Sequence, residues 1–133
     1  MTSRTALPGR GVDIFTSAAR AEATYNSDSE RALGRAGVRI YLDISAESGS
    51  ATLDLKIQGK DQLSTDWVDV PGASFAQKSA VTSNAVSLTL YPGIAETANE
   101  TVSDMLPEEW RVVVVIGGTS VTMTFTVRAE LLA

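Results

Sequence analysis

The chain has 133 residues, 44% of them hydrophobic and 20% charged, which fits one globular domain of ordinary size. It contains no cysteine and no histidine, which excludes a disulfide framework, a Ser-His-Asp triad, a thiolate nucleophile and the commonest zinc and copper ligands. The net charge is −5 and the 11 lysines and arginines are scattered singly, so we expect no direct contact with nucleic acid.

The first nine residues are polar and end in a Pro-Gly pair. We therefore expect residues 1–9 to form a short flexible N-terminal arm and residues 10–133 to form a single β-sandwich domain. No apolar stretch follows the first residues and no run of about 18 apolar residues exists, so neither a secretory signal nor a membrane span is expected. Ordering a flexible arm costs conformational entropy, which binding to a partner offsets. We therefore predict that the residues of the arm contact a partner. These are Thr2, Ser3, Arg4, Thr5, Leu7 and Pro8.

Apolar residues indicate a first short strand over residues 12–15, and residues 21–25 favour a further one. From residue 38 onward the alternation becomes regular, with apolar side chains at every second position of segments 38–45 and 53–58. This period of two is typical of strands with one buried and one solvated face. A short turn-prone loop joins the two segments, so we predict that they pair as an antiparallel hairpin.

A strand over residues 67–70 is predicted to stop at Pro71-Gly72, and another covers residues 86–91. The polar link over residues 94–109 is expected to cross from one sheet to the other. The last strands, residues 110–116 and 121–127, are predicted to pair as a hairpin around a Gly-Gly turn. Both faces of segment 110–116 are apolar, which indicates a central strand.

About six to eight strands with frequent turns predict an all-β fold, either a two-layer antiparallel β-sandwich or a jelly roll. A closed small barrel is the alternative. The first and last strong strand pairs supply the predicted core, which consists of Val38, Ile40, Leu42, Leu53, Leu55, Ile57, Trp110, Val112, Val114 and Phe125. In the same hairpin, Ile116, Met123 and Val127 are expected to face inward with them.

Carboxylates occur in two groups that invite a chemical interpretation. Asp61, Asp66 and Asp69 lie in and beside a polar loop, but their spacing does not match an EF-hand, so we expect a solvated loop and no bound metal. Glu108 and Glu109 are adjacent on a predicted strand and therefore point to opposite faces, which prevents them from forming a glycosidase pair. We expect no enzymatic activity and no cofactor.

Aromatic side chains leave a second possibility open. Trp67, Tyr41 and Tyr91 would form a sugar-binding platform if their rings were exposed on one face. Both Trp67 and Trp110 lie in alternating strands, where an aromatic ring is more often part of the core. The sequence therefore favours the core for both tryptophans.

Several stretches also resemble a known group of proteins. They are LDLKIQG at 53–59, WVDVPGASF at 67–75, LTLYPGIA at 88–95, and WRVVV at 110–114 followed by GGT at 117–119. Their order and spacing resemble small structural proteins from the head-gene regions of actinobacterial phages and prophages, similar to capsid decoration or minor capsid proteins. The resemblance covers roughly residues 10 to 132 and includes no active-site residues.

This resemblance implies a virion protein on the capsid exterior, made in the host cytoplasm, that binds the lattice of the major capsid protein. It also implies contacts between copies of the chain, with a homotrimer as one arrangement, and no partner in a membrane. Many copies on a repeating lattice would make a modest single-site affinity sufficient. The alternatives are a tail, neck or baseplate component, or an adhesin that recognises host surface glycan.

Overall fold

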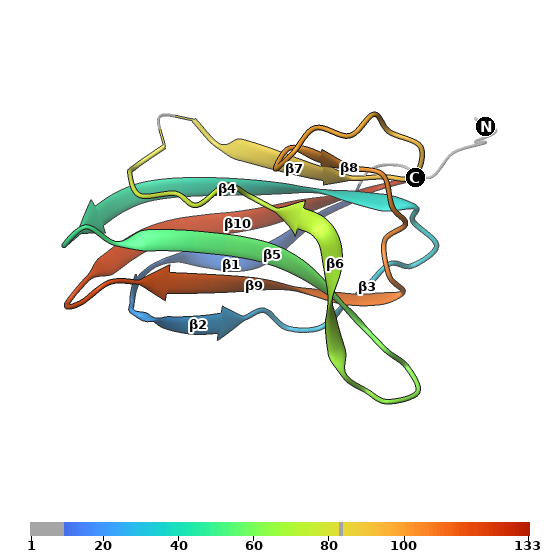
Figure 1. Ribbon diagram of the computed structural model, residues 1–133, viewed down its shortest axis with the longest axis horizontal. Helices are drawn as coiled ribbons and strands as arrows, with labels where there is room; N and C mark the ends of the chain where they lie inside the picture. The colour runs from blue at the N-terminus through green and yellow to red at the C-terminus, as the bar shows by residue number, and fades with distance from the viewer. Residues whose placement is uncertain (1–9, 83) are drawn as a thin grey trace, which may run out of the picture.

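A computed structural model describes residues 10–82 and 84–133 (Figure 1). Over these ranges the chain forms ten β-strands and no helix, which confirms the all-β prediction. None of the described segments is therefore a helix long and apolar enough to cross a membrane. The predicted N-terminal arm, with its proposed contact residues from Thr2 to Pro8, lies outside the described residues.

The strands form two facing sheets (Figure 1). Sheet A consists, in spatial order, of β1 (Arg10–Ala21), β10 (Thr122–Leu132), β4 (Gly37–Ser48), β7 (Val86–Leu90) and β8 (Thr101–Val102). Sheet B consists of β2 (Ala23–Asn26), β9 (Glu109–Gly117), β5 (Thr52–Lys60) and β6 (Trp67–Ser74), and β3 (Glu30–Arg31) also pairs with β9. All neighbours are antiparallel except β7 and β8.

The strand order identifies the sandwich as a jelly roll. Apart from the two-residue strands β3 and β8, sheet A has the order β1-β10-β4-β7 and sheet B the order β2-β9-β5-β6. Among these strands, β5 and β6 are consecutive in the chain and adjacent in a sheet, whereas the other connections cross between the sheets. This interleaving of two Greek keys defines the jelly roll, and the two separate ladders rule out the closed barrel.

The two hairpins predicted from the sequence are wrong. Strand β4 pairs with β10 and β7, whereas β5 pairs with β9 and β6, so residues 38–45 and 53–58 lie in different sheets. Strands β9 and β10 are likewise in different sheets. In both places a few loop residues span the gap of about 10 Å between facing sheets, which is as easy as turning back within one sheet.

Strands β1, β6 and β10 extend well beyond their predicted limits, β10 continuing to Leu132. Strand β1 continues to Ala21. Its pairing with β10 is irregular between Asp13 and Phe15 and between Phe15 and Ala18, and these shifts interrupt the alternation by which the sequence would have revealed its full length. Strand β6 continues through Pro71 to Ser74, although a stop was predicted there. An edge strand tolerates proline because one row of its backbone groups needs no partner, and Gly72 adopts a φ of 76° at the kink.

The space between the sheets is filled by large apolar side chains. All ten residues assigned to the core by alternation are at most 1% exposed, and Ile116, Met123 and Val127 are buried with them. Strand β9 is central in sheet B, as predicted, and its outward Val113 is also buried. The Trp110 indole Nε1 is buried without a hydrogen-bond partner among the described residues, which costs about 1–3 kcal/mol. The link over residues 94–109 crosses from sheet A to sheet B, as predicted, after contributing β8.

Candidate functional site

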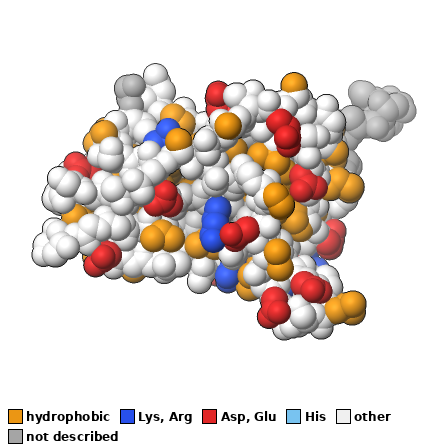
Figure 2. Space-filling model, viewed as in Figure 1, with side chains coloured by type: hydrophobic (Ala, Val, Ile, Leu, Met, Phe, Trp, Pro, Cys, Tyr) orange, Lys and Arg blue, Asp and Glu red, His pale blue; other side chains and the backbone are white. Residues whose placement is uncertain are grey.

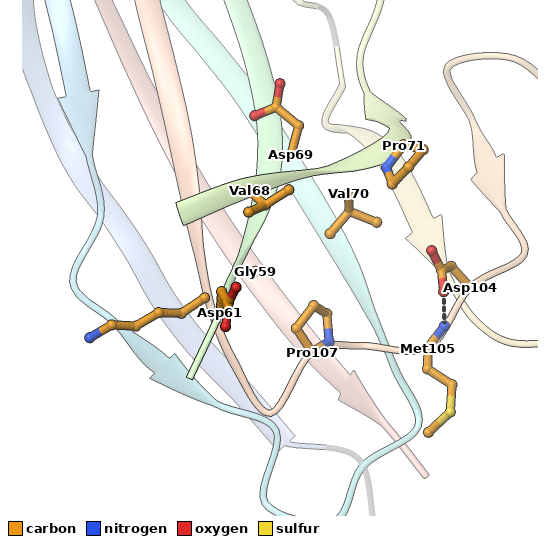
Figure 3. Close-up of a pocket in the computed structure, with 10 residues that line it drawn as sticks. Gly59, Asp61, Val68, Asp69, Val70, Pro71, Asp104, Met105 and Pro107 are labelled. Atoms are coloured by element: carbon orange, nitrogen blue, oxygen red, sulfur yellow. Dashed lines mark hydrogen bonds between the residues drawn. The ribbon is translucent and has the colours of Figure 1, made fainter. Parts of the chain in front are cut away.

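A groove runs beside β6 at one end of the sandwich (Figure 3). It encloses about 310 Å³ and is formed by three segments that are far apart in the sequence. We call it the β6 groove and define it by Gly59, Asp61, Val68, Pro71, Asp104, Met105 and Pro107. Asp61 was considered as a carboxylate and Pro71 as the end of a strand, but no sequence pattern linked either residue to the 103–108 segment.

The groove depends on close packing of the 103–108 segment over β5. A side chain at Gly59 would place its Cβ 2.6 Å from the Pro107 Cγ, so only glycine admits this approach. The segment is also anchored at Leu106, which is 4% exposed and whose backbone N–H donates to the Ala36 carbonyl at 3.0 Å. One wall of the groove is therefore fixed by buried contacts, and the other is β6.

The lining of the groove is apolar and open to solvent. Val68 is 57% exposed and Met105 is 64% exposed, and Pro71 and Pro107 lie between them around the hollow (Figure 3). Leu63, at the tip of the β5–β6 hairpin, is 97% exposed. Exposed apolar side chains that gather beside a hollow mark a surface suited to binding another molecule.

The backbone of β6 borders the same groove. In the described part of the chain, β6 is the last strand of sheet B and pairs with β5 alone. Its free edge therefore presents backbone N–H and C=O groups that an extended peptide can pair with.

Two carboxylates flank the apolar lining. Asp104 Oδ1 accepts a hydrogen bond from the Met105 backbone N–H at 2.8 Å (Figure 3). Asp61 Oδ1 accepts from the backbone N–H groups of Leu63 at 2.9 Å and Ser64 at 3.3 Å, and these bonds hold the pKa of Asp61 below its usual range. Figure 2 shows acidic side chains among hydrophobic ones on this part of the surface. Lys60 and Asp69 also line the groove, but Lys60 pairs with Glu109 and Asp69 pairs with Lys56. Among the described lining residues, Asp61 and Asp104 therefore supply the carboxylates that have no ion pair.

The three aspartates considered for calcium do not converge. Asp69 lies on the outer face of sheet B, where it pairs with the Lys56 ammonium at 3.0 Å and accepts from the Gln58 amide at 2.9 Å. Asp61 instead closes the hairpin turn, with its own N–H donating to the Asp66 carbonyl at 2.8 Å. Across residues 10–82 and 84–133, no cluster of three acidic side chains is arranged to hold a metal ion.

A polar cluster around Glu109 fixes the base of the β5–β6 hairpin. Glu109 is 8% exposed, and its carboxylate accepts hydrogen bonds from the Ser29 hydroxyl and from the Gln62 amide at 3.1 Å. Lys60 at 3.6 Å and Arg31 at 3.7 Å add charge pairing. The Ser29 bond first, then the Gln62 bond, lowers the pKa of Glu109. The cluster ties β3, β9 and the hairpin together.

Sequence reasoning missed this role of Glu109, although it placed Glu108 and Glu109 on opposite faces. Glu108 is exposed and Glu109 is buried, so the two carboxylates point apart as predicted. The available signal was a carboxylate directly before a buried tryptophan. Its partners come from separate strands and loops, which spacing alone does not reveal.

The three aromatic residues considered for sugar binding do not share a surface. Trp67 is half-buried on sheet B, where the Arg111 guanidinium lies 4.4 Å and the Lys60 ammonium 5.7 Å from its ring centre. Tyr41 is in sheet A, where its hydroxyl donates to Glu130, and the Tyr91 hydroxyl donates to the Ala133 carbonyl at 2.6 Å. The prediction that Trp67 belongs to the core is wrong, because on edge strand β6 its ring packs under cations on the outer face.

Comparison with protein-family models, with curated proteins and with solved structures finds no match to this chain.

Proposed function

We propose that the chain is a non-enzymatic structural protein of a tailed-phage virion, which decorates the capsid exterior by binding the major capsid protein lattice and other copies of itself. One observation carries this proposal: a jelly-roll body with a fully packed interior has its apolar, open-edged groove at one end. Jelly rolls recur in viral capsid domains, which supports the proposal by analogy of fold. The resemblance of residues 10 to 132 to phage head proteins adds to it.

The shape of the binding surface suits such a role. A small open groove with an exposed strand edge binds a peptide segment more readily than it encloses a small molecule. Each contact would be modest, but a lattice repeats it many times, so the total attachment is strong. The net charge of −5 favours solubility of the free chain before assembly.

The test is to add the purified chain to capsids that lack it and to locate it by cryo-electron microscopy. We expect saturable binding with a fixed number of copies per capsid hexamer. The variant Met105→Glu should bind more weakly, because it places a charge inside the apolar groove. The matched control is Val81→Glu, since Val81 is also exposed, at 52%, but lies outside the groove.

Two results would contradict the proposal. Binding confined to the tail, with few copies per particle, would make the chain a tail, neck or baseplate component. Saturable binding to host wall polysaccharide without capsid binding would make it an adhesin. The covered ring of Trp67 removes the main structural reason for expecting the second result.

A further inference from the structure

We infer that the β6 groove binds the N-terminal arm of a neighbouring copy of the chain, with Leu7 in the apolar hollow and Arg4 beside Asp104. This inference rests on the proposed function and specifies how copies would contact one another. It concerns a site and a partner that the fold alone does not assign.

The chemistry of the arm complements that of the groove. Over residues 1–9 the one charged side chain is Arg4, and Leu7 is flanked by Ala6 and Pro8. In the groove, Val68 and Met105 supply exposed apolar surface, and Asp104 supplies a carboxylate that no described cation pairs with. An extended segment lying along β6 would also pair with the free strand edge. Lys60 does not oppose the arginine, because its ammonium is held by Glu109 and Trp67.

The arm begins at the end of the sandwich where the groove lies. Arg10 pairs with Leu131, which in turn pairs with Val38 at the start of β4. Just before β4, the Ala36 carbonyl accepts the hydrogen bond from Leu106, next to Met105 of the groove. Copies that meet at this end therefore bring arm and groove together.

The length of the arm indicates that a segment lying along β6 comes from another copy. β1 is one edge of sheet A, whereas β6 contacts β7 on the opposite side of the sandwich. Three strand spacings and one sheet spacing separate these corners by about 18 Å. Leu7 is three residues from Arg10, so extended chain carries it at most about 10 Å away. Leu7 thus falls short of β6 in its own copy, so an arm that lies along this strand comes from a neighbour.

Disulfide trapping tests the contact directly, because the chain has no cysteine of its own. A Leu7→Cys protein carrying a size tag is mixed with an untagged Met105→Cys protein under mild oxidation at several concentrations. We expect a disulfide-linked heterodimer on a non-reducing gel. The matched control replaces Met105→Cys with Val81→Cys, which is similarly exposed and lies by Thr82, whose N–H donates to Ile44 far along β4. Its heterodimer yield should be several-fold lower.

Charge exchange tests the role assigned to Arg4. We expect Arg4→Asp on the tagged partner, or Asp104→Arg on the untagged one, to lower the trapped yield several-fold, and the two together to restore it. Glu22→Arg is the control for Asp104→Arg, because Glu22 is exposed at the far end, beside the Ala21–Thr122 pair. It should leave the yield unchanged.

Each outcome decides the question. Equal trapping at Met105 and Val81 would overturn the inference, and so would trapping only within one chain when both cysteines are on it. Failure of trapping in a chain that decorates capsids at lattice stoichiometry would remove this contact and leave the proposed function standing. Successful trapping in a chain that is absent from capsids would keep the contact and remove the proposed function.

Discussion

Strands β9 and β6 belong to the same sheet, and each has a tryptophan near its start, but the two rings lie in opposite environments. Trp110 of β9 is 0% exposed and fills the space between the sheets. Trp67 of β6 is half-buried on the outer face beneath the guanidinium of Arg111. The difference arises because Trp110 pairs with Gly59 on the inner face of the sheet, whereas Trp67 pairs with Lys60 on the outer face.

The comparison shows that the central strand β9 and the edge strand β6 contribute to different properties of the molecule. The central strand buries both faces of its middle, with Val112 and Val113 at most 4% exposed, and so contributes stability. The edge strand leaves Val68 57% exposed beside an open backbone and so offers a surface. Substitutions in the two regions should therefore differ in what they damage.

The largest expected effect is at the centre of the sheet. Trp110→Ala should lower the free energy of unfolding by about 3–5 kcal/mol, because it empties a large core site. Trp110→Phe should cost less, since it keeps most of the volume and removes an indole N–H that has no hydrogen-bond partner in residues 10–82 and 84–133. Urea unfolding followed by circular dichroism measures both. A loss below about 1 kcal/mol for Trp110→Ala would contradict the burial of this ring.

A smaller effect is expected where β5 meets the wall of the groove. Gly59→Ala should cost about 1–3 kcal/mol, because its Cβ would overlap the Pro107 ring. It should also weaken binding at the β6 groove, since the 103–108 segment must move. Gly11→Ala is the control, because a Cβ at Gly11 meets no atom of the described part of the chain within 4 Å, and the change should leave both properties nearly unchanged.

At the edge strand the expected effect on stability is smaller still. Trp67→Ala should cost about 1 kcal/mol, mostly the cation–π contact with Arg111 and part of the apolar contact area. Its main consequence should be a more mobile β5–β6 hairpin, measured as faster amide hydrogen exchange over residues 61–66. A loss as large as that of Trp110→Ala would erase the distinction between the two strands.

The smallest expected effect is a change in pH dependence at Glu109, whose carboxylate links the two regions. Hydrogen bonds lower the pKa of this group in the folded state, so its stabilising contribution is complete above the unfolded pKa, about 4.3. The contribution disappears as the pH falls through the lower folded pKa. Glu109→Gln should therefore be less stable than the wild type at pH 7, and the two should converge in strong acid. Parallel stability curves from pH 7 to acid would contradict this role.

The sequence predicts which side chains face inward far better than it predicts which strands are neighbours. Alternation at Val38, Ile40 and Leu42 depends on the period of two, which is a local property of any strand. Pairing depends on where distant segments meet. The short loops after Ser48 and Gly117 look like hairpin turns, yet each connects facing sheets. Nothing local distinguishes a turn across the core from a turn within a sheet.

The groove was not predictable for the same reason. Gly59, Val68 and Met105 come from three segments, and only the packing of Pro107 on Gly59 brings them together. Val68 alternates with Trp67, so the expectation of a buried Trp67 placed Val68 on the outer face, whereas Val68 pairs with the inward-facing Gly59. Its exposure does not follow from the edge position of β6 alone, because Val70 on the same strand is 8% exposed; Val68 is exposed because it borders the groove, which the sequence does not encode locally.

The placement of β10 between β1 and β4 also governs how the chain is made. Strands β1 and β4 lie within residues 10–48 and have no complete sheet until residues 122–132 have left the ribosome. At about 5–20 residues per second, the early strands wait on the order of ten seconds with their apolar faces uncovered. Folding is then a late event dominated by contacts between distant residues, which places its rate in the slow, millisecond-to-second range of all-β proteins. Abundant synthesis of this chain would therefore make a heavy demand on the chaperones of the cell that produces it.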